Sequence, residues 1–173
     1  MEIRRLGPSD ANAFQALRLQ ALRECPSAFA SNYEEERNET IAAVSQRMAP
    51  AADRGIFGAF SESELIGSIG FGRESLRKRA HKGFIWGMYV VPAFRNQRVG
   101  RQLISHVLEF AESIQGMRQV HLRVNAANSA AIALYEAVGF RSFGLERGAM
   151  LIDGELHDEI MMARSFAKGE RVP

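Results

Sequence analysis

The feature that most constrains this chain is an apolar run that leads through a short basic turn into an amphipathic helix. Residues 83–91 are almost all apolar or aromatic, as expected for a strand that is buried on both faces. Pro92 ends this run, and from Gly100 to about Ile114 apolar residues recur at helical spacing. The first amide groups of such a helix have no partner within the helix and point outward together. The sequence therefore predicts an anion-binding site at this turn.

The residues of the turn itself favour a phosphate ligand. Arg95, Arg98 and Arg101 add positive charge around the start of the helix. Gly100 lets a ligand approach the backbone closely, because it carries no side chain. We expect a diphosphate to bind here; the other interpretation is an ordinary basic turn with one glycine for geometry. The P-loop pattern and the Gly-x-Gly-x-x-Gly pattern after a strand are both absent.

The remaining segments predict a mixed order of strands and helices. Further strands are expected at residues 1–6, 55–60, 65–73, 120–124, 141–148 and 155–163, the last two joined across Asp153-Gly154. Helices are expected from a cap at Ser9 or Asp10 to Pro26, from Tyr33 to Met48 and from Ser129 to Val138. The order is β-α-α-β-β-β-α-β-α-β-β, an α/β (α+β mixed) fold with one layer of sheet and helices on its faces. No repeat or linker divides the chain, so we expect a single domain over residues 1–173.

The composition excludes several classes of protein. Apolar residues make up 46% and charged residues 24%, and the net charge is only +2, as in an ordinary globular domain. Cys25 stands alone, which rules out an intramolecular disulfide and a cysteine-rich metal site and suits a reducing cytosol. The basic cluster at residues 77–82 is expected to be a solvated connection. We expect a cytoplasmic protein without metal, membrane association or a nucleic-acid partner.

Two segments, taken together, resemble a known family. Residues 95–100, Arg-Asn-Gln-Arg-Val-Gly, are similar to the pyrophosphate-binding signature of the GNAT superfamily of N-acetyltransferases, in which Gln or Arg is followed by two residues, Gly, one residue and Gly or Ala. Arg98 replaces the first glycine, which matters only if that position needs a positive φ. Residues 128–140 match the family motif N-x-x-A-x-x-L-Y-E-x-x-G-F at every fixed position. Alone, this second run could be a capped helix with core side chains.

The resemblance implies that acetyl-CoA binds between two diverging parallel strands, residues 83–91 and 120–124. It implies that the backbone of the first strand pairs with the pantetheine arm and polarises the thioester, and that amides from the turn hold the pyrophosphate. It also implies that Asn128 bonds the pantetheine and that Ala131 makes room for it. The residues expected to bind acetyl-CoA are Met88, Tyr89, Val90, Arg95, Asn96, Gln97, Arg98, Val99, Gly100, Arg101, Asn128 and Ala131.

The resemblance assigns the catalytic acid but no base. Tyr135 matches the family tyrosine near the thioester sulfur, and a phenol with a pKa near 10 can protonate a leaving thiolate. The other interpretation of Tyr135 is a core residue with its hydroxyl at the surface. For the base, His81, the three glutamates at 34–36, Asp158 with Glu159, and a relay through ordered water all remain open.

The acceptor can be predicted only as a class of molecule. Glu34, Glu35 and Trp86 are expected to shape the acceptor mouth, and acidic residues there would favour a cationic amine. We expect an N-acetyltransferase that passes the acetyl group to a primary amine of a small molecule by direct attack in a ternary complex. The alternatives are acetylation of a protein at its N-terminus or a lysine, and a non-catalytic acyl-CoA sensor. Both a monomer and a homodimer through the closing hairpin are open.

Overall fold

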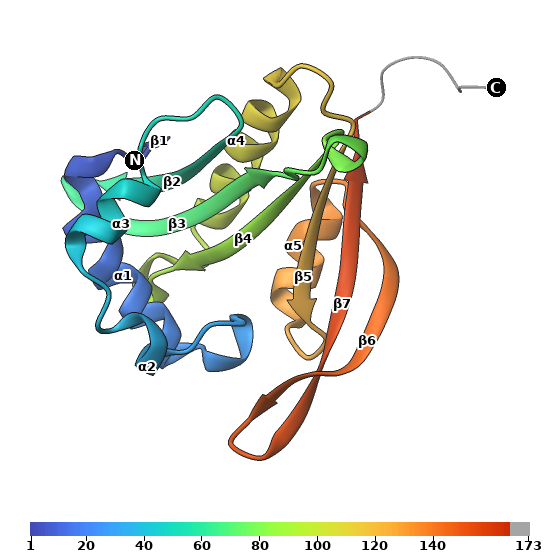
Figure 1. Ribbon diagram of the computed structural model, residues 1–173. Helices are drawn as coiled ribbons and strands as arrows, with labels where there is room; N and C mark the ends of the chain where they lie inside the picture. The colour runs from blue at the N-terminus through green and yellow to red at the C-terminus, as the bar shows by residue number, and fades with distance from the viewer. Residues whose placement is uncertain (167–173) are drawn as a thin grey trace.

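A seven-stranded mixed sheet runs through the protein in the order β1-β2-β3-β4-β5-β7-β6 (Figure 1). This computed structural model describes residues 1–166 of the 173. The strands are β1 (Glu2–Arg5), β2 (Arg54–Ser61), β3 (Glu64–Arg73), β4 (Lys82–Val90), β5 (Gln119–Asn125), β6 (Arg141–Ile152) and β7 (Glu155–Ser165). The helices are α1 (Ala11–Glu24), α2 (Tyr33–Glu36), α3 (Ile41–Arg47), α4 (Val99–Ser113) and α5 (Ser129–Ala137). The expected α/β mixed fold is confirmed.

Strands β4 and β5 form the parallel pair of the sheet, and they separate soon after they begin. They pair only at Lys82↔Gln119, Gly83↔Val120 and Phe84↔His121. Beyond these three pairs the strands continue to Val90 and Asn125 and diverge, as Figure 1 shows. The edge of β4 that faces β5 is therefore open toward its carboxyl end, where backbone groups can pair with a ligand.

The helices cover the sheet on both faces and enclose two cores. One core lies under α4, where Leu103 and Val107 are fully buried against the central strands. The other lies under α1 and α3, where Phe14, Leu17 and Val44 are buried. Both cores hold large aliphatic and aromatic side chains, whose burial contributes roughly 1.5–3 kcal/mol each. The two cores together hold β4 and the start of α4 in place.

The segment that was expected to form one helix from Tyr33 to Met48 forms two. Asn32 caps α2, because its side chain accepts a hydrogen bond from the Glu35 amide at 2.9 Å. Thr40 then adopts an extended conformation and its hydroxyl accepts from the Ala43 amide at 3.2 Å, which starts α3. The Ala43 amide bonds to the Thr40 hydroxyl, as at the start of a helix, so the chain forms two helices here rather than one continuous helix.

The prediction that residues 83–91 are buried on both faces is wrong. Phe84 is 41% exposed and Trp86 is 37% exposed, while Ile85 between them is buried. Helix α4 packs against β4 on the Ile85 side. On the opposite face α1 packs mainly over β3 and leaves this part of β4 open. The first part of the run therefore has an incompletely covered face, whereas Tyr89 near its end belongs to the second core.

No helix among residues 1–166 is long and apolar enough to cross a bilayer.

Candidate active site

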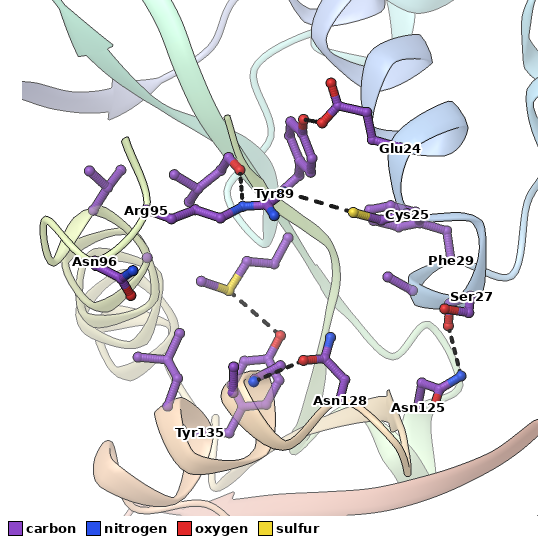
Figure 2. Close-up of a pocket in the computed structure, with 18 of the residues that line it drawn as sticks. Glu24, Cys25, Ser27, Phe29, Tyr89, Arg95, Asn96, Asn125, Asn128 and Tyr135 are labelled. Atoms are coloured by element: carbon purple, nitrogen blue, oxygen red, sulfur yellow. Dashed lines mark hydrogen bonds between the residues drawn. The ribbon is translucent and has the colours of Figure 1, made fainter. Parts of the chain in front are cut away.

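A cleft of about 800 Å³ opens where β4 and β5 diverge. The end of β4, the turn before α4, helix α5 and residues 24–29 form its walls (Figure 2). A smaller pocket of about 70 Å³ lies beside it, between β4 and β5. The two share the residues Ala28, Met88, Asn125, Asn128, Ala131 and Tyr135. These residues form the junction of the two pockets.

The turn before α4 presents its backbone amides to the cleft. Asn96 and Arg98 both have left-handed φ values, 61° and 65°. Such alternation of backbone conformation turns successive N–H groups toward one point and makes an anion-binding concavity. The first amide with a partner is that of Gln102, which donates to the Arg98 carbonyl at 3.0 Å. Among the described residues, none of the amides from Asn96 to Arg101 has an acceptor. The turn is thus equipped to bind an anion at the start of α4.

The polar side chains of the turn differ in what they contact. Arg95 lines the cleft, donates from Nε to the Val90 carbonyl at 3.0 Å, and lies over the Tyr89 ring. Arg98 and Arg101 also line the cleft. Their charges reinforce the positive end of the α4 dipole.

Two residues of the expected cofactor set are already engaged. Gln97 does not border the cleft; its side chain is exposed and donates to the Ala93 carbonyl at 2.9 Å. The Val90 carbonyl accepts one hydrogen bond, from Arg95. A carbonyl oxygen has two lone pairs, so this group can still pair with a ligand, as can the other backbone groups on the open edge of β4.

Gly100 borders the cleft and also meets a packing requirement that the sequence did not suggest. A β-carbon at this position would stand 3.0 Å from the Met88 Cε and 3.3 Å from a methyl group of Leu134. These contacts are tighter than ordinary van der Waals packing. The missing side chain therefore lets α4 pack closely against β4 and α5. The close approach of a ligand to this backbone stays a prediction.

Tyr89 joins β4 to α1 through its side chain. The ring is buried and its hydroxyl donates to the Glu24 carboxylate at the rim of the cleft (Figure 2). Burial, and then the hydrogen bond to Glu24, raise the pKa of Tyr89 well above its usual value. Glu24 was not indicated by the sequence, because its pairing with Tyr89 joins residues far apart in the chain.

Tyr135 lies at the junction with its hydroxyl directed toward β4. The residue is only 8% exposed, and the hydroxyl is 3.6 Å from the Met88 sulfur (Figure 2). Burial raises the pKa of Tyr135 to about 12. The phenol is therefore protonated throughout the neutral range and can act as a proton donor but not as a base. The interpretation that its hydroxyl lies at the surface is wrong.

Two asparagines organise the far side of the junction. Asn128 caps α5, because its Oδ1 accepts from the Ala131 amide at 3.1 Å. Asn125, at the end of β5, donates from Nδ2 to the Ser27 carbonyl at 3.1 Å and so ties the 24–29 segment to the sheet. No sequence pattern indicated Asn125 or Ser27, although Asn125 directly follows the strand expected at residues 120–124.

Comparison with known proteins identifies the family. A family model described as the acetyltransferase (GNAT) family matches residues 19–140. The chain belongs to the GNAT acetyltransferase family. Among solved structures, a GNAT acetyltransferase of Streptococcus pneumoniae has a TM-score of 0.85 at 21% identity, covering 95% of this chain and 99% of that one. The structure of yncA from Salmonella typhimurium has a TM-score of 0.83 at 18% identity, covering 100% of this chain and 98% of that one.

Curated relatives match over shorter segments. The ribosomal protein bS18-alanine N-acetyltransferase of Escherichia coli is 34% identical over 79 residues, which are 46% of this chain and 53% of the relative. The N-alpha-acetyltransferase RimI of Mycobacterium tuberculosis is 35% identical over 97 residues, which are 56% of this chain and 58% of the relative. The chain therefore spans about half the length of these two relatives.

The glutamates of this GNAT protein do not line the acceptor mouth as the sequence suggested. Glu34 pairs with Arg37 at 2.9 Å, and Glu35 accepts from the Asn32 amide and completes the cap of α2. Glu36 pairs with Arg18. None of the three borders either pocket, whereas Trp86 borders the smaller one. The short helix α2 uses these acids for its own capping and tethering, which sequence spacing could not reveal.

Among residues 1–166, no group of His, Cys, Asp and Glu is arranged to hold a metal ion.

Arg98 stands where the GNAT signature has glycine, and its φ of 65° is strained for a residue with a side chain. We expect Arg98→Gly to raise the free energy of unfolding by about 1 kcal/mol, since the left-handed conformation costs other residues roughly that much. Urea unfolding of the purified variant measures the change. Gln97→Gly is the matched control: φ is not positive there, so this change should give no gain. A stability of Arg98→Gly at or below that of the unchanged protein would contradict the prediction.

Proposed function

We propose that this protein transfers the acetyl group of acetyl-CoA to a primary amine. The observation that carries the proposal is the larger cleft itself: among the described residues, an array of free amides opens onto one end of it, and a protonated buried tyrosine stands at the other. An anion-binding turn and a proton donor at the two ends of one long cleft suit a ligand with a phosphate at one end and a reacting thioester at the other. The name of the Salmonella yncA structure records acetyl-CoA as that protein's cofactor.

The residues present fit acetyl-CoA. The amides of residues 96–101 would hold the pyrophosphate, with Arg98 and Arg101 adding charge. The open edge of β4 would pair with the pantetheine arm, and the Met88 amide would donate to the thioester carbonyl. Asn128, whose Oδ1 is used by the α5 cap, has its Nδ2 left for the arm. A cleft of about 800 Å³ is in the range of pockets that bind cofactors.

The proposed acetyl transfer gives a chemical role to few side chains. Acetyl-CoA, when bound, supplies an activated acetyl thioester. Tyr135 holds a proton on its oxygen beside Met88; as the amine nitrogen bonds to the acetyl carbon and the C–S bond breaks, it would give this proton to the leaving sulfur and regain one from water. Among the described residues, Glu24 is the one carboxylate that borders either pocket, and no histidine does. We therefore propose that the amine loses its proton through ordered water rather than to a side chain at the junction.

The acceptor site is the smaller pocket beside Trp86. Its volume of about 70 Å³ suits a small primary amine or the first residue of a longer chain. Two relatives are named as an alanine N-acetyltransferase of a ribosomal protein and as an N-alpha-acetyltransferase, which supports a protein N-terminus as the second candidate. A homodimer through β6, an edge strand of the sheet, stays a prediction that light scattering in solution would test.

Blocking the junction tests the cofactor half of the proposal. Ala131→Trp puts a large side chain between the two pockets and should weaken acetyl-CoA binding by at least about 10-fold in titration calorimetry, because the ring takes the place of the ligand. Ala133→Trp is the matched control: it lies on the same helix, is exposed and borders neither pocket, so affinity should be unchanged. Normal affinity in a folded Ala131→Trp variant would overturn the assignment.

Release of the free thiol, measured with small amines, peptides and proteins, tests the transfer half. Turnover on small amines supports the leading proposal, and turnover on peptides alone supports the protein N-terminus. Tight binding of acetyl-CoA with no turnover on any acceptor would instead identify a non-catalytic sensor.

A further inference from the structure

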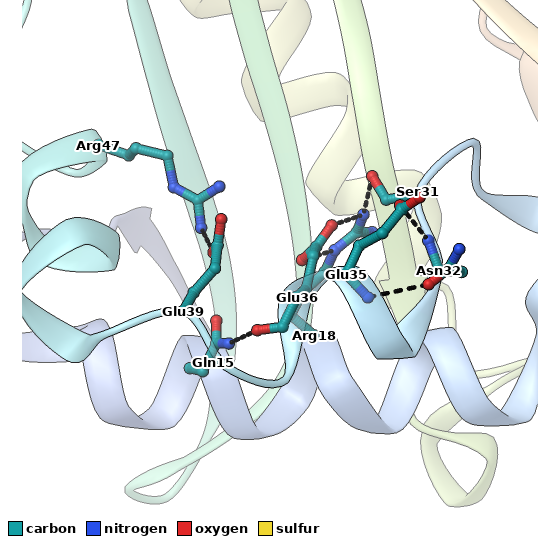
Figure 3. A network of polar contacts seen from close by, with 8 residues as sticks. All are labelled: Gln15, Arg18, Ser31, Asn32, Glu35, Glu36, Glu39 and Arg47. Atoms are coloured by element: carbon teal, nitrogen blue, oxygen red, sulfur yellow. Dashed lines mark hydrogen bonds and ion pairs between the residues drawn. The ribbon is translucent and has the colours of Figure 1, made fainter.

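The guanidinium of Arg18 is buried where α1, the loop before α2 and β4 meet. The residue is 7% exposed, and Nε and Nη2 donate to the Glu36 carboxylate at 2.9 and 2.8 Å (Figure 3). Nη2 also reaches the Ser31 hydroxyl at 3.4 Å. Nη1 is buried as well, yet among residues 1–166 it has no hydrogen-bond partner. A buried donor without an acceptor is costly, so this nitrogen points to a group that the protein itself does not supply.

Nη1 faces the part of β4 that borders the smaller pocket. Gly87 has a φ of 63°, and a β-carbon built there would stand 3.7 Å from Nη1. Apart from the chain neighbours of Gly87, no other heavy atom of the described residues lies within 4 Å of that point. Because Gly87 has no side chain, Nη1 is the nearest described atom beyond the backbone on this side of the residue. Gly87 borders the smaller pocket, and the next residue is Met88, beside the Tyr135 hydroxyl.

The orientation of the guanidinium is held from the other side. Its carbon lies 4.8 Å from the centre of the Phe29 ring, and Phe29 borders the larger cleft. With Glu36 on one edge and Phe29 on one face, the group has little freedom to turn. Nη1 is therefore a preorganised donor behind Gly87, which borders the smaller pocket.

We infer that Arg18 is a specificity residue that donates from Nη1 to a carbonyl or carboxylate oxygen of the amine acceptor. The inference rests on the proposed function. Glu36 balances the positive charge, so recognition depends on a hydrogen bond rather than on net charge, and a neutral amide oxygen serves as well as a carboxylate. Gly87 and Met88 are adjacent, and consecutive α-carbons are about 3.8 Å apart. An oxygen bound beside Gly87 and a nitrogen that reacts beside Met88 would belong to one small group of the acceptor, as in an α-amino acid or the N-terminal residue of a peptide.

The role of Arg18 can be tested on the unchanged protein with pairs of acceptors that differ in whether they carry a carbonyl or carboxylate oxygen near the amine. We would compare kcat/KM for alanine, alanylglycine and ethylamine, and for the corresponding phenylalanine, phenylalanylglycine and phenethylamine. The acceptors with an oxygen should be acetylated at least about 10-fold more efficiently than the amine without one, the factor expected from a hydrogen bond to a charged group. Preference for the free amino acid or for the dipeptide distinguishes the two sources of this chemistry.

Two variants separate recognition from a structural role. Arg18→Lys keeps a positive charge opposite Glu36 but has no second nitrogen to reach Gly87, so the preference should fall to about 2-fold or less, with acetyl-CoA affinity unchanged. Arg18→Met combined with Glu36→Leu replaces the ion pair by apolar groups and should give the same loss of acceptor preference. This double variant provides the test if Arg18→Lys does not fold. A merely structural role would slow all acceptors alike and leave their ratio intact.

The inference is overturned if the unchanged protein shows no preference, or if the preference survives in the folded variants. Failure of the proposed function looks different: acetyl-CoA would not bind, or ethylamine, phenethylamine and the oxygen-bearing acceptors would all remain unacetylated. That outcome would overturn both statements, whereas turnover without preference overturns only the role of Arg18.

Discussion

Tyr135→Phe should lower kcat for acetyl transfer by about 100-fold, with acetyl-CoA affinity changed by no more than about 2-fold. The substitution removes only the hydroxyl, whose partner in the structure is the sulfur of Met88 at 3.6 Å. The ring, which packs against Phe140 in the core, stays in place. The loss should therefore appear in the chemical step, because the leaving thiolate must then take its proton from water. Steady-state kinetics together with titration calorimetry separates the two quantities.

Tyr33→Phe is the control for this experiment, since Tyr33 lies at the start of α2 and borders neither pocket. Its kcat should equal that of the unchanged protein. If Tyr135→Phe retained full kcat, the hydroxyl would have no role in proton transfer and Tyr135 would be a core residue only.

Glu36→Leu should lower the free energy of unfolding by about 3–5 kcal/mol, the usual cost of breaking a buried ion pair on one side. Arg18 and Glu36 have side chains only 8% and 12% exposed, so the variant leaves a buried guanidinium without its anion. Replacing both residues, Arg18→Met with Glu36→Leu, removes the charge as well and should bring stability back to within about 1 kcal/mol of the unchanged protein. Urea unfolding of the three proteins measures these differences. A loss below about 1 kcal/mol in Glu36→Leu would contradict the prediction.

The same ion pair gives the protein an acid-sensitive component of stability. Burial acts to raise the pKa of Glu36, but the hydrogen bonds and charge of Arg18 outweigh it, so the pKa in the folded protein is lower than usual. A carboxyl group with a lowered folded pKa contributes stability above its unfolded pKa of about 4.3, and this is lost as the pH falls through the folded value. The difference in stability between the unchanged protein and Glu36→Leu should hence be constant from neutral pH down to about pH 5 and shrink below about pH 4.

The strands, most of the helices and the position of the cleft could be predicted because they depend on local patterns. The periodicity of residues 100–114 predicted α4, and the Asp153-Gly154 pair predicted the closing turn, where both residues have positive φ. The run of residues 128–140 placed Tyr135 on α5 and Gly139 in the left-handed conformation that ends it. In each case the chemistry of neighbouring residues was sufficient.

Where prediction failed, a distant segment decided the result. Glu36 is drawn into a pair with Arg18 on another helix, which no spacing within 34–36 reveals. Trp86 is exposed because α1 covers β3 rather than the whole of β4. The packing requirement at Gly100, where a β-carbon would crowd Met88 and Leu134, likewise comes from other elements.

The sequence by itself thus determined that a basic turn with free amides precedes α4 and that a tyrosine follows on α5, since both depend on residues within one turn or one helix. Only the tertiary structure decided that this tyrosine is buried beside Met88, that the acids of α2 border neither pocket, and that Arg18 Nη1, behind Gly87, has no partner among residues 1–166. These features depend on how two faces of a sheet are covered, and the free energy of that packing is shared among residues far apart in the chain.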